Sequence, residues 1–430
     1  FDLDRSSEDC LMLNVWTPDA DAVADLPVMV WIHGGGYVNG SGNIARLNSP
    51  DFARRGVVLV TVNYRLSVFG FMTHPALAAS NPDEAKGNYA LQDLLASLQW
   101  IQTNIREFGG NPDNVTIFGE SAGAGLVNTL LVMPAAKGLF HKAISQSSSV
   151  GLSPEPYRDK RAGFQPPSDK AGVAFARRAG IEDYRSDSPD VARALRTLST
   201  ADVLSTLSER DRFTPIVDGA ILPDHVGALH AAGRINAVPY ITGGVSWEAS
   251  LGREIGGPFS PENMARLVPD DVKQRLYPGL SGAALEDAVF GDLIIHSASD
   301  YTAGHIAQQG VDVYRYYLSY LASARREVQP GPAHADDIAF VLGTLEAESD
   351  LTEIDASDRA VSDLLQSYWV QFARTSDPNA KGLPRWPGVS ADASPVIEIG
   401  DDIVVHESFL GERLRYHRER SEKLLARARE

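Results

Sequence analysis

The chain has 430 residues, of which 43% are hydrophobic and 22% are charged, a composition typical of globular proteins. Its formal net charge of −17 disfavours nucleic acid as a partner, because such binders need basic patches to neutralise phosphates. The single cysteine, Cys10, excludes an internal disulfide and a cysteine-based zinc cluster. No apolar run approaches the about 20 residues that span a bilayer. We therefore expect no metal, no cofactor and no membrane span, and we attribute the charge to solubility.

The first residues, Phe1-Asp2-Leu3-Asp4-Arg5, have neither the basic start nor the apolar core of a secretory signal peptide. The compartment stays open, because a chain whose leader had been removed would be secreted or periplasmic, and otherwise it would be cytoplasmic. The oligomeric state is equally open.

The first half of the chain alternates short apolar runs with helical patterns. Leucines recur at helical spacing over 89–108, and glycine, asparagine and proline at 109–113 end that helix. We expect strands, in chain order, at 28–32, 57–62, 115–118 and 141–146. This alternation predicts a mostly parallel sheet with helices on both faces.

The second half adds two helical blocks, at 153–213 and 258–309. We predict that both are helical cap or lid insertions within a single domain covering 1–430. Two further strands are expected at 238–242 and 311–317, followed near the end by a strand-like run at 403–405. The last segment, 407–430, is an arginine-rich helix whose interspersed glutamates favour a solvated surface over a membrane or partner contact.

Gly119-Glu120-Ser121-Ala122-Gly123 carries the G-x-S-x-G pattern of a nucleophile elbow, which holds a serine on a sharp turn between a strand and a helix. The predicted strand at 115–118 precedes it, and 122–133 has the composition of a helix that packs on a sheet. A bare five-residue match occurs by chance, but a match between a strand and a helix is much rarer. We predict that Ser121 is a catalytic nucleophile.

A nucleophilic serine needs a base to take its proton, and in this elbow class the acid and then the histidine follow the serine along the chain. His334 follows the strand at 311–321 through a proline-rich loop, so we predict that it is the base. A lone histidine is more often structural or solvated. The other histidines of the second half lie in helical patterns or near the end of the fold: His296, His305, His406 and His417.

Glu248 is the predicted acid, because it follows the strand at 238–242 through a short glycine-containing loop. The competing interpretation is a carboxylate that is favoured by the dipole at a helix N-terminus. Turn chemistry explains Asp218 and Asp224 adequately, and Glu254 is the nearest rival.

His33-Gly34-Gly35-Gly36 comes directly after a predicted strand. Glycines expose backbone N–H groups that no side chain shields, which suits the binding of a developing alkoxide. Glycine triplets also occur in ordinary turns and phosphate loops, but the lysine and hydroxyl residue of a P-loop are missing here. An H-G-G-G pattern ahead of an elbow is known for esterases and lipases, so we predict an oxyanion hole.

Together these motifs resemble the type-B carboxylesterase family, the cholinesterase-like branch of the α/β-hydrolases. Four blocks carry the likeness, at 8–15, 33–37, 108–123 and 334–343. The resemblance implies the α/β-hydrolase fold, a mostly parallel central sheet flanked by helices. It also implies a catalytic triad of Ser121, Glu248 and His334 and an oxyanion hole formed by the N–H groups of Gly35, Gly36 and Ala122.

Two departures from the family stand out. The family usually has Asp-Glu-Gly where this chain has Trp247-Glu248-Ala249, so the glutamate is kept but the resemblance does not fix the local loop geometry. Relatives also carry several dozen residues ahead of the block at 8–15, including edge strands and a cysteine that pairs with the counterpart of Cys10. We expect a free thiol at Cys10 and an incomplete sheet edge beside it unless upstream residues cover that edge.

The resemblance implies a serine carboxylesterase that acts on a small-molecule ester, whose acyl and alcohol groups the sequence does not name. An amidase, a lipase or a toxin-degrading esterase would use the same triad, and a non-catalytic adhesion or binding member of the family is a further alternative. Tyr37, Trp247 and Phe340 adjoin the motifs and are candidate substrate-binding residues, although aromatic side chains are often simply core.

Overall fold

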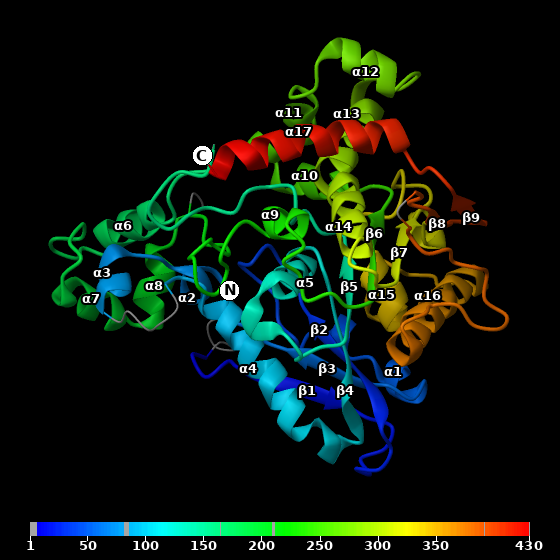
Figure 1. Cartoon of the computed structure of the whole chain (residues 1–430), viewed down its shortest axis with the longest axis horizontal. Helices are drawn as coiled ribbons and strands as arrows, with labels where there is room; N and C mark the ends of the chain where they lie inside the picture. The colour runs from blue at the N-terminus through cyan, green and yellow to red at the C-terminus, as the bar shows by residue number, and fades with distance from the viewer. Residues whose placement is uncertain (1–6, 81–85, 164, 209–210, 391, 430) are drawn as a thin grey trace.

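The computed structural model describes residues 7–80, 86–163, 165–208, 211–390 and 392–429. Its centre is a sheet with the strand order β1-β3-β2-β4-β5-β6-β7-β8-β9 (Figure 1). The strands are β1 (Leu13–Trp16), β2 (Leu26–Ile32), β3 (Val58–Val62), β4 (Gly110–Glu120), β5 (Lys142–Gln146), β6 (Tyr240–Val245), β7 (Val313–Leu318), β8 (Val396–Ile399) and β9 (Ile403–His406).

The sheet is parallel from β3 through β8, and only the two outer strands, β1 and β9, pair antiparallel. This confirms the mostly parallel sheet that the sequence predicts. Among the predicted strands the largest boundary difference is in β4, which begins at Gly110 rather than at Val115, whereas the other boundaries differ by no more than a few residues. Gly110 pairs with Leu26 ahead of a register shift, so ladder pairing extends into the segment that its glycine and proline assigned to a loop.

The helices flank this sheet in chain order. They are α1 (Pro50–Arg54), α2 (Ser67–Phe71), α3 (Pro75–Ser80), α4 (Tyr89–Asn104), α5 (Ala122–Val132), α6 (Asp169–Arg178), α7 (Pro189–Arg196), α8 (Thr200–Thr206), α9 (Val226–Ala231), α10 (Ala249–Ile255), α11 (Pro261–Ala265), α12 (Asp270–Leu276), α13 (Gly282–Gly291), α14 (Ser297–Ala307), α15 (Asp337–Leu342), α16 (Ala356–Thr375) and α17 (Gly411–Arg429).

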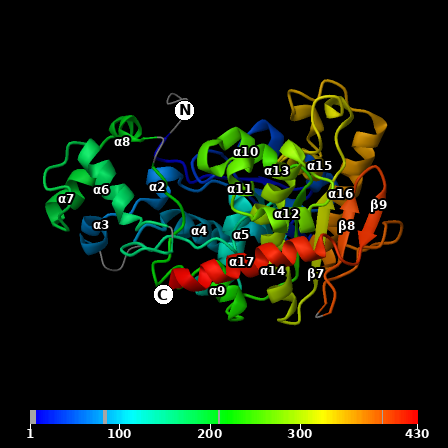
Figure 2. The ribbon, with the colours of Figure 1, turned by 90° about the horizontal axis from the view of Figure 1, so that it is seen from above.

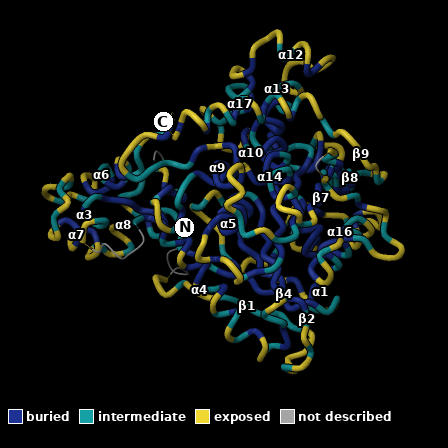
Figure 3. Tube along the Cα trace, viewed as in Figure 1, coloured by how far each residue is buried: buried dark blue, intermediate teal, exposed yellow. Residues whose placement is uncertain are grey.

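Both faces of the sheet are apolar, which explains why helices cover both. Along β2, Val28, Val30 and Ile32 enter the hydrophobic cluster formed with α4 and α5, whereas Met29 and Trp31 enter the cluster formed with α15 and α16. Successive strand residues point to opposite faces, so a continuous apolar run buries a strand on both sides. Figure 3 shows the buried sheet at the centre of the molecule, with exposed residues gathered in the outer helices and loops.

The helices of the two predicted insertions lie mostly outside these layers. α6, α7 and α8 gather with α3 at one end of the molecule, far from β8 and β9 (Figures 1 and 2). α11, α12 and α13 project beyond the long helix α17 (Figure 1). The last helix of the second block, α14, instead packs on β6 and β7, so the segment 258–309 ends in a helix of the sheet layer. The capping role of both segments stays a prediction.

Candidate functional site

Ser121 lies on the turn between β4 and α5 with φ 57° and ψ −123°, a conformation that L-residues rarely adopt. The turn is held by the Ser121 N–H, which donates to the Gln146 carbonyl at 2.9 Å. Gly123 packs so tightly on the end of β2 that a Cβ there would collide with the Ile32 carbonyl oxygen. The strand, turn and helix predicted around this serine are therefore present, and close backbone packing fixes the turn.

His334 lies between the serine and a carboxylate. Its Nε2 lies 2.8 Å from Ser121 Oγ, and its Nδ1 lies 2.6 Å from Glu248 Oε2. The side chain of Glu120, the residue before the serine, lies 3.2 Å from the same Nε2. With a proton on Nδ1, the ring donates to Glu248 and leaves Nε2 free to accept the serine proton, which is the arrangement that activates a hydroxyl.

Glu248 is fully buried, and both of its oxygens are engaged. Oε1 accepts from Ser147 Oγ at 2.7 Å and from the Val245 N–H at 2.9 Å, which leaves Oε2 for His334. Although Glu248 is the N-cap residue of α10, its side chain makes no capping hydrogen bond. The geometry therefore favours the acid that the sequence predicts over a carboxylate held by the helix dipole.

The loops that carry the acid and the histidine are joined to each other. The Trp247 N–H donates to the Pro332 carbonyl at 3.1 Å, and Ser250 Oγ accepts from the His334 N–H at 2.8 Å. One loop leaves β6 and the other leaves β7, and these strands are neighbours in the sheet. The carboxyl ends of adjacent parallel strands thus bring together residues far apart in the chain.

Buried carboxyl groups around the His334 imidazole determine the electrostatics of the group formed by Ser121, His334 and Glu248. Burial alone would lower the pKa of His334, but Glu120 and Glu248 outweigh it and raise that pKa to about 9. Burial also disfavours the charged form of Glu248, yet His334 prevails and the pKa of that carboxyl is lowered. Burial dominates at Glu120 and raises its pKa to about 8. The pKa values of Glu120 and Glu248 therefore move in opposite directions, although both side chains face His334.

The glycine loop after β2 lies against the serine. A Cβ on Gly34 would lie 3.3 Å from Ser121 Cβ, so the loop backbone and the elbow are in direct contact. Gly35 and Gly36 have φ of 104° and 62°, in the left-handed region that favours glycine. Within the described parts of the chain, the N–H groups of Gly35, Gly36 and Ala122 have no hydrogen-bond acceptor. Unused donors beside a nucleophile can bind an oxyanion.

The three aromatic candidates have different surroundings. Tyr37 directly follows the glycine loop, and its ring packs edge-on against Phe71 at 5.6 Å. Trp247 donates its indole N–H to Asp287 at 2.9 Å, which ties the acid loop to α13. Phe340 is only 1% exposed and packs in the hydrophobic cluster of α15 and α16, so its predicted role in substrate binding stays a prediction. Aromatic composition does not distinguish a pocket wall from a core residue.

The rival acids and histidines make other contacts. Among them, His296 is buried near Glu248, although burial itself dominates and lowers the pKa of His296. Glu254 is exposed on α10. The others bond to or stack on partners elsewhere in the fold: Asp218, Asp224, His305, His406 and His417.

Several residues around the site escaped sequence analysis. Glu120 occupies a variable position of the elbow motif, and Ser147 and Ser250 follow no motif. Asp336 and Arg325 support the turn that carries His334. The signal available for Glu120 was its place beside the nucleophile, since a carboxyl group there must face the reacting histidine or be buried. Asp336 lies in the histidine block at 334–343, but that block did not assign it a role, and no local pattern marks Ser147, Ser250 or Arg325.

Cys10 lines a cavity of about 740 Å³ that also includes His33, Asn39 and Arg65. Ser121, Glu248 and His334 are not among its lining residues. Cys10 is half-buried and is the single cysteine of the chain, so it has no disulfide partner within it.

Among the residues that the structure describes, no group of three or more histidine, cysteine or acidic side chains is arranged to hold a metal ion. Within the same residues, no helix combines the length and the apolar character needed to cross a membrane.

Comparisons with known proteins identify the family of the chain. A model of the carboxylesterase family matches residues 1–267 and 270–417. The fumonisin B1 esterase of Sphingopyxis macrogoltabida is 32% identical over 403 residues, covering 89% of this chain and 71% of that protein. The medium-chain fatty acyl-CoA hydrolase precursor of Anas platyrhynchos is 35% identical over 419 residues, covering 90% of this chain and 71% of the relative.

Solved structures give the same result for the fold. The carboxylesterase EST55 of Geobacillus stearothermophilus superposes with a TM-score of 0.81 at 29% identity, covering 96% of this chain and 86% of that one. The α/β-hydrolase fold implied by the sequence is thereby confirmed. Since both the family model and these relatives cover most of its length, the chain belongs to the carboxylesterase family and is a carboxylic ester hydrolase.

Proposed function

We propose that the chain hydrolyses carboxylic esters through an acyl-enzyme on Ser121, with His334 as general base and acid and Glu248 as the residue that orients it. The observation that carries the proposal is the position of His334, at 2.8 Å from Ser121 Oγ and at 2.6 Å from Glu248 Oε2. These distances lie within hydrogen-bond reach, the geometric requirement for a general base.

In the first half of the reaction, Ser121 Oγ attacks the ester carbonyl carbon while His334 Nε2 takes the serine proton. The negative charge that develops on the carbonyl oxygen is stabilised by the N–H groups of Gly35, Gly36 and Ala122, which need no reorganisation to receive it. When the carbonyl re-forms, the bond to the alcohol oxygen breaks. His334 gives its proton to that oxygen, and the alcohol leaves.

The second half repeats these steps with water in place of the alcohol. His334 takes a proton from the water, the hydroxide attacks the acyl carbon, and the proton returns to Ser121 Oγ as the carboxylic acid leaves. Glu248 stays ionised throughout, because His334 holds its pKa below the usual range, and it stabilises the imidazolium that forms in each half.

Labelling with a fluorophosphonate tests the proposal. The reagent phosphonylates a serine whose hydroxyl is activated by a base, so intact-mass analysis should show one adduct, and peptide mapping should place it on Ser121. His334→Ala keeps the serine but removes the base, and it should abolish the labelling. A folded protein that gives no adduct, or an adduct on another serine, would contradict the assignment. The first result would instead favour a binding member of the family.

The substrate class is tested with a panel of esters and matched amides that vary in acyl length and charge. Faster hydrolysis of the esters is expected of a carboxylesterase. Equal or faster turnover of amides would favour the amidase alternative, and a preference for long acyl chains would favour the lipase. One relative is a fumonisin B1 esterase by name, so fumonisin B1 belongs in the panel.

A further inference from the structure

The turn that carries His334 is closed by the side chain of Asp336. Its Oδ2 accepts from the Ala333 N–H at 2.7 Å, and its own N–H donates to the Ala333 carbonyl at 2.9 Å. Between them Ala335 has φ 73°, in the left-handed region that a residue with a Cβ avoids. Such a conformation persists only where the surrounding contacts over-determine it.

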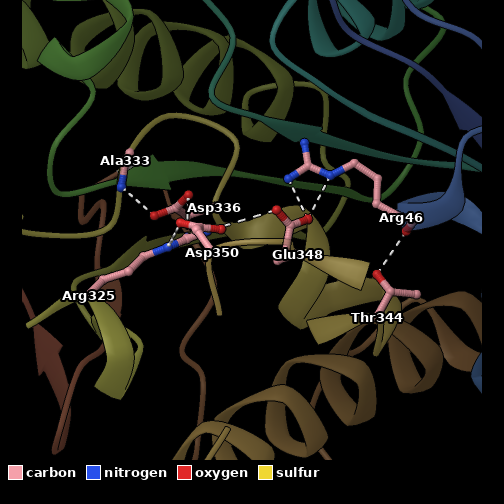
Figure 4. A network of polar contacts seen from close by, with 7 residues as sticks. All are labelled: Arg46, Arg325, Ala333, Asp336, Thr344, Glu348 and Asp350. Carbon is pink, nitrogen blue, oxygen red and sulfur yellow. Dashed lines mark hydrogen bonds and ion pairs between the residues drawn. The ribbon is translucent and has the colours of Figure 1, made fainter. Parts of the chain in front are cut away.

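Asp336 belongs to a line of charges, which we call the charged row: Arg46, Glu348, Arg325 and Asp336 (Figure 4). Arg325 Nη1 lies 2.8 Å from Asp336 Oδ1, and its Nη2 lies 3.9 Å from Glu348 Oε2. Arg46 in turn donates from Nε and Nη2 to Glu348 Oε1 at 2.8 and 2.6 Å. Asp350 receives two parallel bonds from Arg325, both at 2.8 Å.

The row is shielded from water around the histidine turn. The side chains of Arg325, Asp336 and Glu348 are 8%, 12% and 13% exposed. Burial raises the pKa of Asp336 to about 6, against the lowering effect of Arg325. The far end of the row, Arg46, lies in the 3-10 helix η2 (Ala45–Leu47), and Thr344 Oγ1 donates to its carbonyl at 2.8 Å. The row therefore crosses from the segment after the glycine loop to the turn of His334.

We propose that Asp336, fixed by Arg325, is a positioning residue that holds the strained turn and thereby keeps His334 Nε2 within reach of Ser121 Oγ. It touches neither the substrate nor the reacting atoms. The inference rests on the proposed function, since it assigns a task to the turn only if His334 is the base. One oxygen closes the turn and the other lies 2.8 Å from Arg325 Nη1, so both oxygens of the carboxylate are engaged and its orientation is set.

Two variants separate these contacts. Asp336→Asn keeps an acceptor for the Ala333 N–H but loses the ion pair, and Asp336→Ala loses both. We expect kcat to fall about tenfold in the first and about a hundredfold in the second, because a misplacement of about 1 Å costs on that order. KM should change by less than about threefold, because ground-state binding is untouched. All rates are divided by the number of active sites, which fluorophosphonate labelling of Ser121 counts. Unfolded molecules therefore do not contribute.

Ala335→Gly distinguishes a positioning role from a merely structural one. If Asp336 acts by holding the strained turn, relieving the strain at Ala335 should change the effect of Asp336→Asn on kcat. Glycine adopts the left-handed conformation without a Cβ penalty, so the turn needs less support. The loss in kcat per site caused by Asp336→Asn should therefore be smaller in the Ala335→Gly background. Arg325→Lys keeps the charge beside Asp336 but loses the two parallel bonds to Asp350, and it should reduce kcat by less than Asp336→Ala does.

Glu346→Gln is the matched control. Glu346 pairs with Arg359 at 2.5 Å, both side chains are more than half exposed, and the residue lies two positions before Glu348. Exposed pairs contribute little, so kcat should be unchanged.

The proposal is overturned if the kcat per active site of the Asp336→Ala variant lies within about twofold of the parent value. It is also overturned if no Asp336 variant has active sites that fluorophosphonate can label, either in the parent or in the Ala335→Gly background. The role of Asp336 would then be structural. Labelling of the parent at Ser121 tests the proposed function separately.

Discussion

The serine elbow and the histidine turn meet across a 2.8 Å contact, but close backbone packing holds the elbow whereas charged side chains hold the turn. Around the elbow, β4 from Val115 onward and all of α5 are buried, and Gly123 leaves no room for a Cβ. Around the turn, Arg325 and Asp336 add charged contacts to the hydrogen bonds that join this loop to the acid loop. The elbow geometry therefore follows from a short stretch of sequence, whereas the turn depends on ionised partners from elsewhere in the chain.

The largest effect is expected from the elbow itself. Ser121→Ala should lower kcat by about 10⁶-fold, as removal of the nucleophile does in a serine protease, while the residual rate comes from binding and the oxyanion hole. The melting temperature should stay unchanged, since the Ser121 backbone contacts remain. Steady-state hydrolysis of an activated ester checks this. A purified variant that keeps more than a few per cent of the parent rate would refute the assignment.

The second-largest effect on kcat is expected at Glu248, the predicted acid beside His334. Glu248→Gln keeps the size of the side chain but removes the charge that orients His334, so kcat should fall about 10⁴-fold, as in the corresponding change in a serine protease. Single-turnover kinetics with active-site titration measure this loss. Glu254→Gln, on the exposed face of α10, is the matched control and should leave kcat unchanged.

Packing of the elbow is tested by Gly123→Ala. The new Cβ would meet the Ile32 carbonyl oxygen, so β2 and α5 must move apart, and the free energy of unfolding should fall by about 1–3 kcal/mol or more. Gly304→Ala on α14 adds the same methyl group where no atom lies within 4 Å, and it should raise stability slightly. Denaturant unfolding of both variants gives the comparison. Equal stabilities would show that the elbow tolerates a looser fit.

The pH profile addresses the charges around His334. The base must be neutral, and its pKa is raised from 6.5 to about 9 by Glu120 and Glu248, which outweigh burial. The acid limb of kcat/KM should therefore lie above 6.5, with activity lost as pH falls through it. Glu120→Gln removes one of these carboxylates and should move the limb to lower pH. A limb at or below pH 6.5 in the parent would contradict this electrostatic account.

The smallest effect is expected at Trp247. Trp247→Phe keeps an aromatic ring but loses the N–H that donates to Asp287, so the unfolding free energy should fall by about 1 kcal/mol. KM across a panel of esters should change little if the ring serves mainly to anchor α13. A change in KM with unchanged stability would instead support the substrate-binding role predicted from the sequence.

Much of the fold could be predicted because its signals are local. β-branched runs marked the central strands, leucines at helical spacing marked α4, and the glycines of the elbow motif marked the turn between β4 and α5. The candidate acid and histidine were found from chain order, because each follows a strand and the carboxyl ends of parallel strands meet.

The charged row could not be predicted in the same way. Arg46 and Glu348 are 302 positions apart, and nothing in the sequence around either residue indicates the other. The surroundings of Phe340 could not be predicted for a related reason, since its neighbours in sequence belong to the histidine block while its neighbours in space form the core. The start of β4 was missed because ladder pairing across a register shift overrode the turn preference of its glycine and proline.

The distance along the chain between Ser121 and His334 affects how the protein is made. The two residues are 213 positions apart, so at about 5–20 residues per second the ribosome adds the histidine roughly 10–40 s after the serine. During that interval the elbow strand and helix have been synthesised, but the base that would activate the serine has not. A nascent chain that stalls between the two residues should therefore display a serine without hydrolytic activity, and reactivity should appear only once translation has passed the histidine turn.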